Sequence, residues 1–83
     1  MKEFIHFTAD WCNPCKRMAP VIERFIAENP DIKYTKVDVD KDTDLVKEYR
    51  IQSVPTFLAV VDGKITKMLG GLKTESEIKS IFG

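Results

Sequence analysis

The amino-acid sequence predicts an α/β domain in which helices pack on one sheet, with the element order β-α-β-α-β-β-α. Three observations lead to this prediction. The apolar residues form a short run at residues 4–7 and then recur with a helical period from Cys12 onward. An Asp62-Gly63 pair, typical of a hairpin turn, separates two β-rich segments. Thr74 and Glu77 have the spacing of a helix capping box. A chain of 83 residues is the size of one domain, so we expect a single domain over residues 1–83.

In the first half of the chain, residues 4–7 predict a mostly apolar strand, as expected in a sheet covered on both faces. The following helix should begin near Cys12 and end near Asn29-Pro30, a pair that breaks helices. Pro20 lies inside it and predicts a kink. Residues 32–39 alternate as a second strand. The predicted buried face of the helix consists of Met18, Val21, Ile22, Phe25 and Ile26.

In the second half, Asp42 or Thr43 is expected to cap a short helix through residue 49, with Leu45, Val46 and Tyr49 turned inward. Residues 56–61 and 65–69 predict the two strands of the hairpin, and the second strand ends at two glycines. A final helix follows the capping box and has Ile78, Ile81 and Phe82 on one face.

Charge and hydropathy exclude several classes of function. Thirteen basic and thirteen acidic side chains cancel, so nothing in the net charge favours binding to nucleic acid or to an anionic membrane. No apolar segment approaches the ~20 residues of a membrane span, and the first residues lack the apolar core of a signal peptide. We therefore expect a cytoplasmic monomer, in a compartment where thiols are mostly reduced.

The sequence also argues against bound metals and nucleotides. The alternating aspartates at positions 38–44 lack the Gly and Glu that a calcium loop requires, since those positions hold Thr43 and Tyr49. A zinc site needs about four ligands, and the chain offers only two cysteines and His6. There is no dinucleotide fingerprint or phosphate-binding loop. We expect no cofactor.

The cysteine pair is the strongest functional signal. Cys12 and Cys15 lie where a predicted strand gives way to a helix, so the first sulfur should lie beside free backbone N–H groups at the positive end of the helix dipole. This position favours the thiolate, the form that attacks disulfides. A loop this short would stabilise the fold little as a structural disulfide. A redox pair is therefore the preferred interpretation.

Residues 9–16 (ADWCNPCK) resemble the W-C-G-P-C-K signature of the thioredoxin family, with Asn13 in place of the usual glycine. The segments Met18-Ala19-Pro20, residues 37–40 (VDVD), residues 53–56 (SVPT) and Gly70-Gly71 are similar to further family motifs, so the likeness spans nearly the whole chain. The resemblance implies a minimal thioredoxin fold with a four-stranded mixed sheet and three helices. The chain is similar to a small, glutaredoxin-sized form without the family's N-terminal strand and helix.

The resemblance implies a role for each matching residue. Cys12 would be the nucleophile and Cys15 the resolving cysteine. Independently of the resemblance, Asn13 and Pro14 set the local stiffness between the cysteines and are expected to tune the redox potential. The substrate would contact a further set of residues: Trp11, Val54, a cis Pro55 and Gly70. A core position for Trp11 remains an equal alternative.

His6 occupies the position where thioredoxins usually carry a buried aspartate, and Lys36 falls where the family has a nearby lysine. Burial and Lys36 should both lower the pKa of His6 and keep it neutral. We hypothesise that His6 carries the proton of Cys15; a hydrogen-bonded core histidine without a catalytic role is the alternative.

The predicted function is reduction of protein disulfides by dithiol exchange, with a thioredoxin reductase or glutathione as electron donor. One alternative is a glutaredoxin-like enzyme that uses glutathione, although Asn13-Pro14 differs from the Pro-Tyr usual in that family. Another is a non-catalytic binding subunit with a thioredoxin fold.

Overall fold

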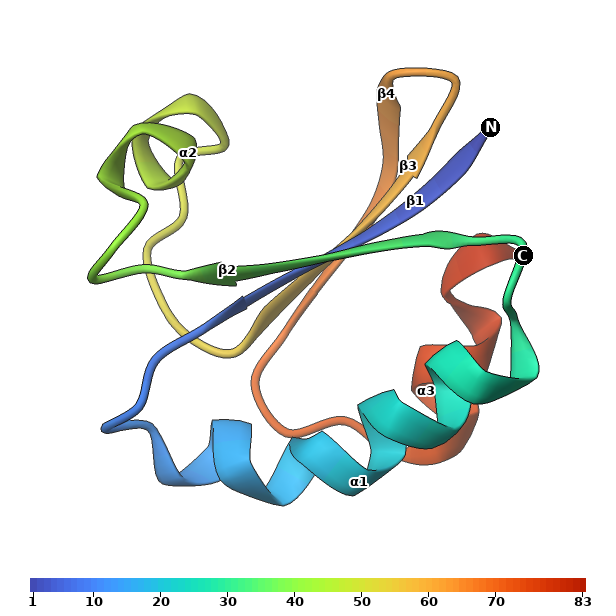
Figure 1. Cartoon of the computed structure of the whole chain (residues 1–83), viewed down its shortest axis with the longest axis horizontal. Coiled ribbons are helices and arrows are strands. Elements are labelled where there is room, and N and C mark those ends of the chain that lie inside the picture. The colour runs from blue at the N-terminus through green and yellow to red at the C-terminus, as the bar shows by residue number, and fades with distance from the viewer.

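The computed structural model describes residues 1–83 and shows a four-stranded sheet with helices on both faces (Figure 1). The predicted order of elements is confirmed, and a short 3-10 turn follows the last helix. The elements are β1 (Lys2–Thr8), α1 (Asn13–Glu28), β2 (Lys33–Asp38), α2 (Thr43–Glu48), β3 (Thr56–Val61), β4 (Lys64–Gly70), α3 (Glu75–Lys79) and the 3-10 turn Ser80–Phe82.

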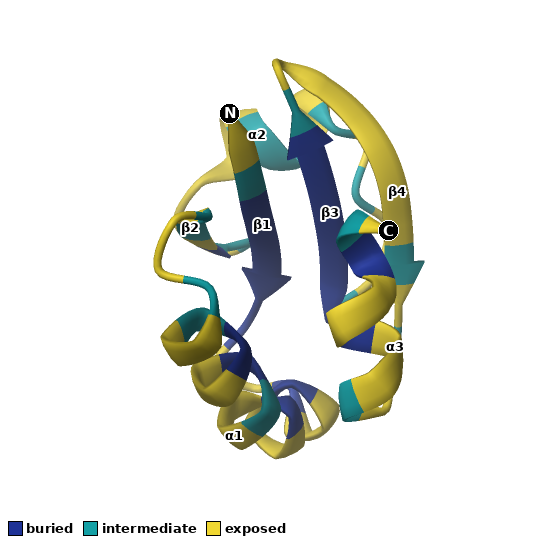
Figure 2. Cartoon of the chain, turned by 90° about the vertical axis from the view of Figure 1, so that its right-hand side faces the viewer, coloured by how far each residue is buried: buried dark blue, intermediate teal, exposed yellow.

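The strands lie in the order β2-β1-β3-β4, so β1 and β3 occupy the centre of the sheet. β1 is parallel to β2 and antiparallel to β3, and β4 is antiparallel to β3. Figure 2 shows β1 and β3 buried along most of their length, whereas β4 is largely exposed. This burial explains why residues 4–7 form a nearly continuous apolar run.

α1 and α3 cover one face of the sheet and enclose the larger part of the core. Phe4 packs its ring against Phe25 of α1, with ring centroids 5.0 Å apart, and against Phe57 of β3. α1 continues as one helix through Pro20. The fully buried members of this cluster are Phe4, Met18, Ile22, Phe25, Phe57, Ala59, Ile78 and Ile81, while Val21 and Ile26 of the predicted face are half-buried.

The short helix α2 covers part of the opposite face. Its N-cap is Asp42, whose side chain accepts a hydrogen bond from the backbone of Leu45. Leu45 and Val46, together with Tyr49 just after the helix, pack as half-buried residues on the second cluster of the core. That cluster consists of Ile5, Phe7, Val37, Leu58 and Val60.

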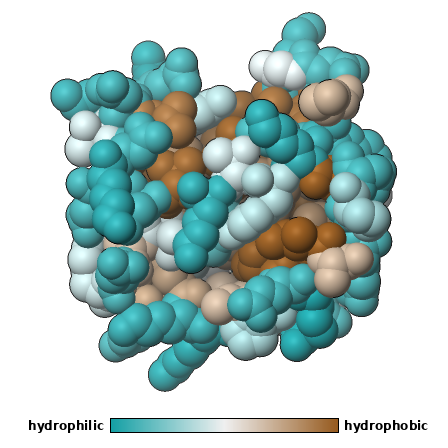
Figure 3. Space-filling view, in the orientation of Figure 1, coloured by the Kyte–Doolittle hydropathy of each residue, from teal (hydrophilic) through white to brown (hydrophobic).

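The predicted turn chemistry is also present. Asp62 and Gly63 both have positive φ, as a two-residue hairpin turn of the primed type requires. Thr74 and Glu77 form the capping box at the start of α3. Polar side chains cover most of the face seen in Figure 3, and its apolar areas are separate from one another. None of the helices combines the length and the apolar character needed to cross a membrane.

Candidate active site

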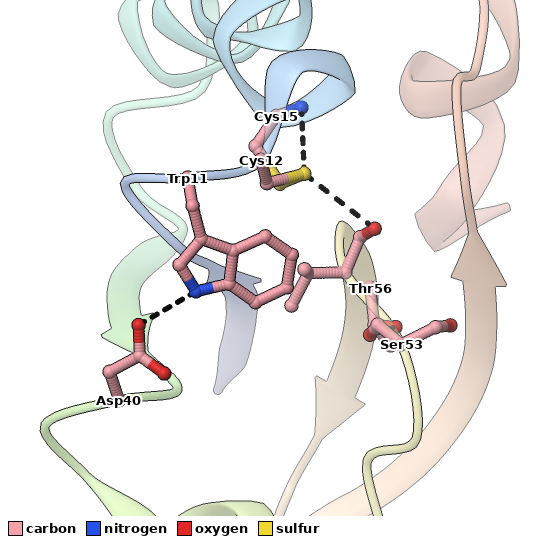
Figure 4. The surroundings of a disulfide bond; sticks show 7 residues. Trp11, Cys12, Cys15, Asp40, Ser53 and Thr56 are labelled. Carbon is pink, nitrogen blue, oxygen red and sulfur yellow. Dashed lines mark hydrogen bonds between the residues drawn. A yellow bond between two sulfur atoms is a disulfide. The ribbon is translucent and has the colours of Figure 1, made fainter.

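The two cysteines lie at the junction of β1 and α1, as predicted. Cys12 is the N-cap of α1, and Cys15 lies in the first turn of the helix. They form a disulfide, with their Cα atoms 5.2 Å apart (Figure 4). Both residues are only 4% exposed, so a partner must approach the sulfur atoms closely to react with them.

The start of α1 stabilises negative charge on the sulfur of Cys12. The backbone N–H of Cys15 donates a hydrogen bond to Cys12 Sγ over 3.2 Å. The first turn of α1 contains no acidic residue to offset the positive end of the helix dipole. Pro14 costs little there, because the N–H groups of the first turn have no partner within the helix. When the disulfide is reduced, these features favour Cys12 as a thiolate.

A loop before β3 faces the disulfide. The Val54–Pro55 peptide bond is cis, which confirms the expectation for Pro55. The carbonyl oxygen of Val54 lies 3.7 Å from Cys12 Sγ. Two hydrogen bonds hold the loop: Thr56 Oγ1 donates to the Ser53 carbonyl over 2.7 Å, and the Gly71 N–H donates to the Pro55 carbonyl over 2.9 Å.

Trp11 lies outside the core, with 66% of the residue exposed, which settles the alternative that the sequence left open. Its Nε1–H donates a hydrogen bond to the carboxylate of Asp40 over 2.8 Å (Figure 4). The indole forms one wall of an apolar hollow beside the disulfide. The other lining residues are Val39, Val46, Ile51, Gln52, Ser53 and Val54.

His6 lies on β1 behind the cysteines and is only 4% exposed. Its Nδ1 is 3.0 Å from the hydroxyl oxygen of Tyr34, whereas its Nε2 is buried and has no hydrogen-bond partner. His6 and Cys15 line the same cleft of about 640 Å³. Burial and, secondarily, the charge of Lys36 lower the pKa of His6 from 6.5 to about 4. The expected direction of this shift and its two causes are confirmed.

A model of the thioredoxin family matches residues 2–82. The chain belongs to the thioredoxin family. It is 35% identical over 81 residues to the thioredoxin of Mycoplasmoides gallisepticum, which covers 98% of this chain and 81% of that protein. The fold superposes on the oxidised form of mitochondrial thioredoxin 3 from Saccharomyces cerevisiae with a TM-score of 0.89 and 36% identity, covering 98% of this chain and 76% of the other.

The chain is shorter than some of its thioredoxin relatives. It is 36% identical over 79 residues to the mitochondrial thioredoxin of Mus musculus, an alignment that covers 94% of this chain and 48% of that protein. The chain thus spans about half the length of this relative.

The residues that resembled thioredoxin motifs lie together in two groups. Around the disulfide are Asn13, Pro14, Trp11, Val54 and Pro55. Gly70 lies beside the loop, since a Cβ placed on it would be 4.0 Å from the Pro55 oxygen. His6 and Lys36 lie opposite each other on β1 and β2, and both line the cleft on the Cys15 side.

Sequence reasoning missed two contacts of this thioredoxin site. It did not identify Tyr34 as the partner of His6 or Asp40 as the partner of Trp11. The sequence does contain a signal for Tyr34. Tyr34 and Lys36 are two residues apart in an alternating strand and therefore share a face, and the family resemblance already places Lys36 near His6.

Proposed function

We propose that this chain reduces disulfide bonds of partner proteins by thiol–disulfide exchange, with Cys12 as the nucleophile and Cys15 as the resolving thiol. The main support is the disulfide at the start of α1, with Cys12 Sγ accepting a backbone N–H and facing the Val54 carbonyl. The membership of the thioredoxin family supports the same reaction.

The exchange takes two steps. The Cys12 thiolate attacks one sulfur of the substrate disulfide, forms a mixed disulfide and releases the other substrate sulfur as a thiolate. Cys15 then loses its proton and attacks Cys12 Sγ, which forms the Cys12–Cys15 disulfide and releases the second substrate thiolate. The substrate gains two electrons, and an external dithiol or thiol, from a thioredoxin reductase or from glutathione, must return the pair to the reduced form.

The loop opposite the sulfur atoms suits an extended substrate segment. A substrate strand beside Val54 would form backbone hydrogen bonds as an added strand does. The cis Pro55 follows Val54 in this loop, Gly70 beside it carries no side chain, and the exposed ring of Trp11 offers apolar contact. We assign these four residues to substrate binding.

The site also contains a candidate proton acceptor for Cys15. His6 is neutral near pH 7, because burial and Lys36 hold its pKa at about 4. Its Nε2 is buried without a hydrogen-bond partner, and His6 and Cys15 line the same cleft. We assign the proton transfer of the second step to His6, with Lys36 keeping it neutral.

Insulin reduction tests the main proposal. The reduced chain should accelerate the cleavage of insulin disulfides, and Cys12→Ser should abolish this activity. Cys15→Ser should instead accumulate the mixed disulfide, visible by mass spectrometry. Loss of insulin reduction only in Cys15→Ser, with full activity in Cys12→Ser, would reverse the assigned roles. Retention of activity in both variants would exclude the mechanism.

Two further measurements refine the proposal. The first compares turnover with thioredoxin reductase as electron donor and turnover with glutathione as electron donor. It distinguishes a thioredoxin-type reductase from a glutaredoxin-like enzyme. A redox titration of the Cys12–Cys15 pair in the wild type and in Asn13→Gly measures how far Asn13 tunes the reduction potential.

We also propose a cytoplasmic location and a monomeric state for this chain. Several of its relatives are mitochondrial thioredoxins.

A further inference from the structure

The two ring nitrogens of His6 have different surroundings. Nδ1 is 3.0 Å from the Tyr34 hydroxyl oxygen, while Nε2 has no hydrogen-bond partner and is buried. A neutral imidazole carries its proton on only one nitrogen, and the partner of the other nitrogen decides which one. The Tyr34 hydroxyl is therefore placed to determine whether Nε2 carries the proton of the neutral ring.

The Tyr34 hydroxyl can act either as donor or as acceptor. Burial and then the charge of Glu23 raise the pKa of Tyr34 to about 12, so this hydroxyl keeps its proton at neutral pH. Tyr34 is half-buried and lines the same open cleft as His6, so its hydroxyl proton can exchange with solvent.

We infer that Tyr34 is a positioning residue for the chemistry of Cys15. When its oxygen accepts the Nδ1–H of His6, Nε2 carries a lone pair and can take the proton of the Cys15 thiol. When its hydroxyl donates to Nδ1, Nε2 carries a proton that it can return. This inference rests on the proposed function, because it concerns the second step of that reaction.

The proton transfer from Cys15 through His6 to Tyr34 balances. The thiol proton of Cys15 moves to Nε2, the proton on Nδ1 moves to the Tyr34 oxygen, and the former hydroxyl proton leaves to solvent in the cleft. His6 changes from one neutral tautomer to the other and never becomes an imidazolium. This route fits a histidine whose burial and neighbouring Lys36 disfavour the charged form.

The other groups around the cleft form no hydrogen bond with the ring nitrogens of His6, so the hydrogen bond to Tyr34 determines its tautomer. The ring of Phe57 stacks against His6 from β3, with centroids 5.0 Å apart, and contributes no charge. The other acidic and basic side chains that line the cleft are Asp10, Glu23, Asp38, Lys16, Lys36 and Lys41. Lys36 disfavours a positive charge on the ring as a whole, whereas the Tyr34 hydroxyl contacts Nδ1 alone, so this hydrogen bond determines the tautomer.

Stopped-flow reaction of the reduced chain with the disulfide reagent dithiobis(nitrobenzoate) separates the two steps of the exchange. Attack by Cys12 releases the first thionitrobenzoate, and attack by Cys15 on the resulting mixed disulfide releases the second. Tyr34→Phe removes one oxygen atom and should leave the first phase unchanged. The second phase should slow about fivefold at pH 7, the factor that corresponds to the loss of one hydrogen bond of about 1 kcal/mol. Tyr49→Phe on the other face of the sheet is the matched control and should change neither phase.

The pH profile distinguishes a positioning role from a structural one. With the relay intact, the second phase should vary little between about pH 5 and 8. In Tyr34→Phe it should rise with pH and meet the wild-type rate once the pH is high enough to ionise Cys15 unaided. A constant difference at every pH, or no difference, would overturn the inference.

NMR supplies a readout that does not depend on the variant. The chain has one histidine, so the shifts of its two ring nitrogens report the tautomer of His6 directly. Reduced wild type should carry the proton on Nδ1, and Tyr34→Phe should not. A proton on Nε2 in the reduced wild type would overturn the inference even if the variant failed to fold. A wild type that releases no thionitrobenzoate would instead contradict the proposed function itself.

Discussion

His6 should make the stability of this protein depend on pH in a range where few side chains titrate. The pKa of His6 is lowered from 6.5 to about 4 in the folded chain, whereas in the unfolded chain it keeps its ordinary value. Between these two values the unfolded chain binds more protons, so the free energy of unfolding rises with pH. This contribution is complete above pH 6.5 and is lost as the pH falls through the window toward 4.

The magnitude follows from the gap between the two pKa values. From 6.5 to about 4 the gap corresponds to about 3 kcal/mol, at about 1.4 kcal/mol per pH unit. A domain of this size is stable by roughly 4–12 kcal/mol, so the loss would be a large part of the total. Replacing His6 by Asn, which is polar but does not titrate, should remove the effect.

Urea denaturation of the oxidised protein at several pH values between 7 and 4 measures this difference. Asp62, Glu75 and Glu77 also have pKa values lowered by hydrogen bonds, but they titrate equally in both proteins and cancel in the comparison. Lys36→Gln should remove a smaller part of the effect, because Lys36 is the secondary cause. Identical pH dependence in wild type and His6→Asn would refute the reasoning, as would an imidazole that titrates near 6.5 by NMR.

Three further predictions concern other parts of the chain. Gly71→Ala should lower the free energy of unfolding by about 1–2 kcal/mol because Gly71 has φ +82°, whereas Gly70→Ala, which meets only an ordinary contact, should cost less in the same urea titration. Thr74→Ala should destabilise by about 1 kcal/mol through loss of the α3 cap, while Ser76→Ala in the same exposed turn should have little effect on the melting curve. Trp11→Ala should slow insulin reduction several-fold, because the exposed ring offers contact area to a protein partner. The first phase with the small reagent dithiobis(nitrobenzoate) should stay nearly unchanged.

Most of the fold was predictable because its determinants are local. The start of α1, the hairpin at Asp62-Gly63 and the capping box at Thr74 each depend on residues within a few positions of one another. The last helix shows the limit of such patterns. α3 ends at Lys79, and the chain continues as a 3-10 turn in which the Ser80 hydroxyl donates to the Glu77 carbonyl over 2.8 Å. A serine that bonds the backbone in this way competes with the helical pattern.

The contacts that sequence reasoning missed join residues far apart in the chain. His6 and Tyr34 are separated by 28 positions, and Trp11 and Asp40 by 29. The first pair depends on the register of β1 against β2, which places His6 opposite Lys36 and leaves Tyr34 on the same face. A strand pattern shows which face a residue occupies, but it does not show the register against a neighbouring strand.

The environment of position 6 favours an imidazole that stays neutral over one that titrates. Burial disfavours the charged form of any side chain, and Lys36 disfavours a second positive charge. The two effects add for a histidine, but they would oppose each other for an aspartate, whose pKa burial raises and a lysine lowers. An aspartate here would stay closer to its titration range and could pick up a proton by itself. A histidine held this far from titration can move a proton at neutral pH only by passing another one on, and Tyr34 is the group in contact with its second nitrogen.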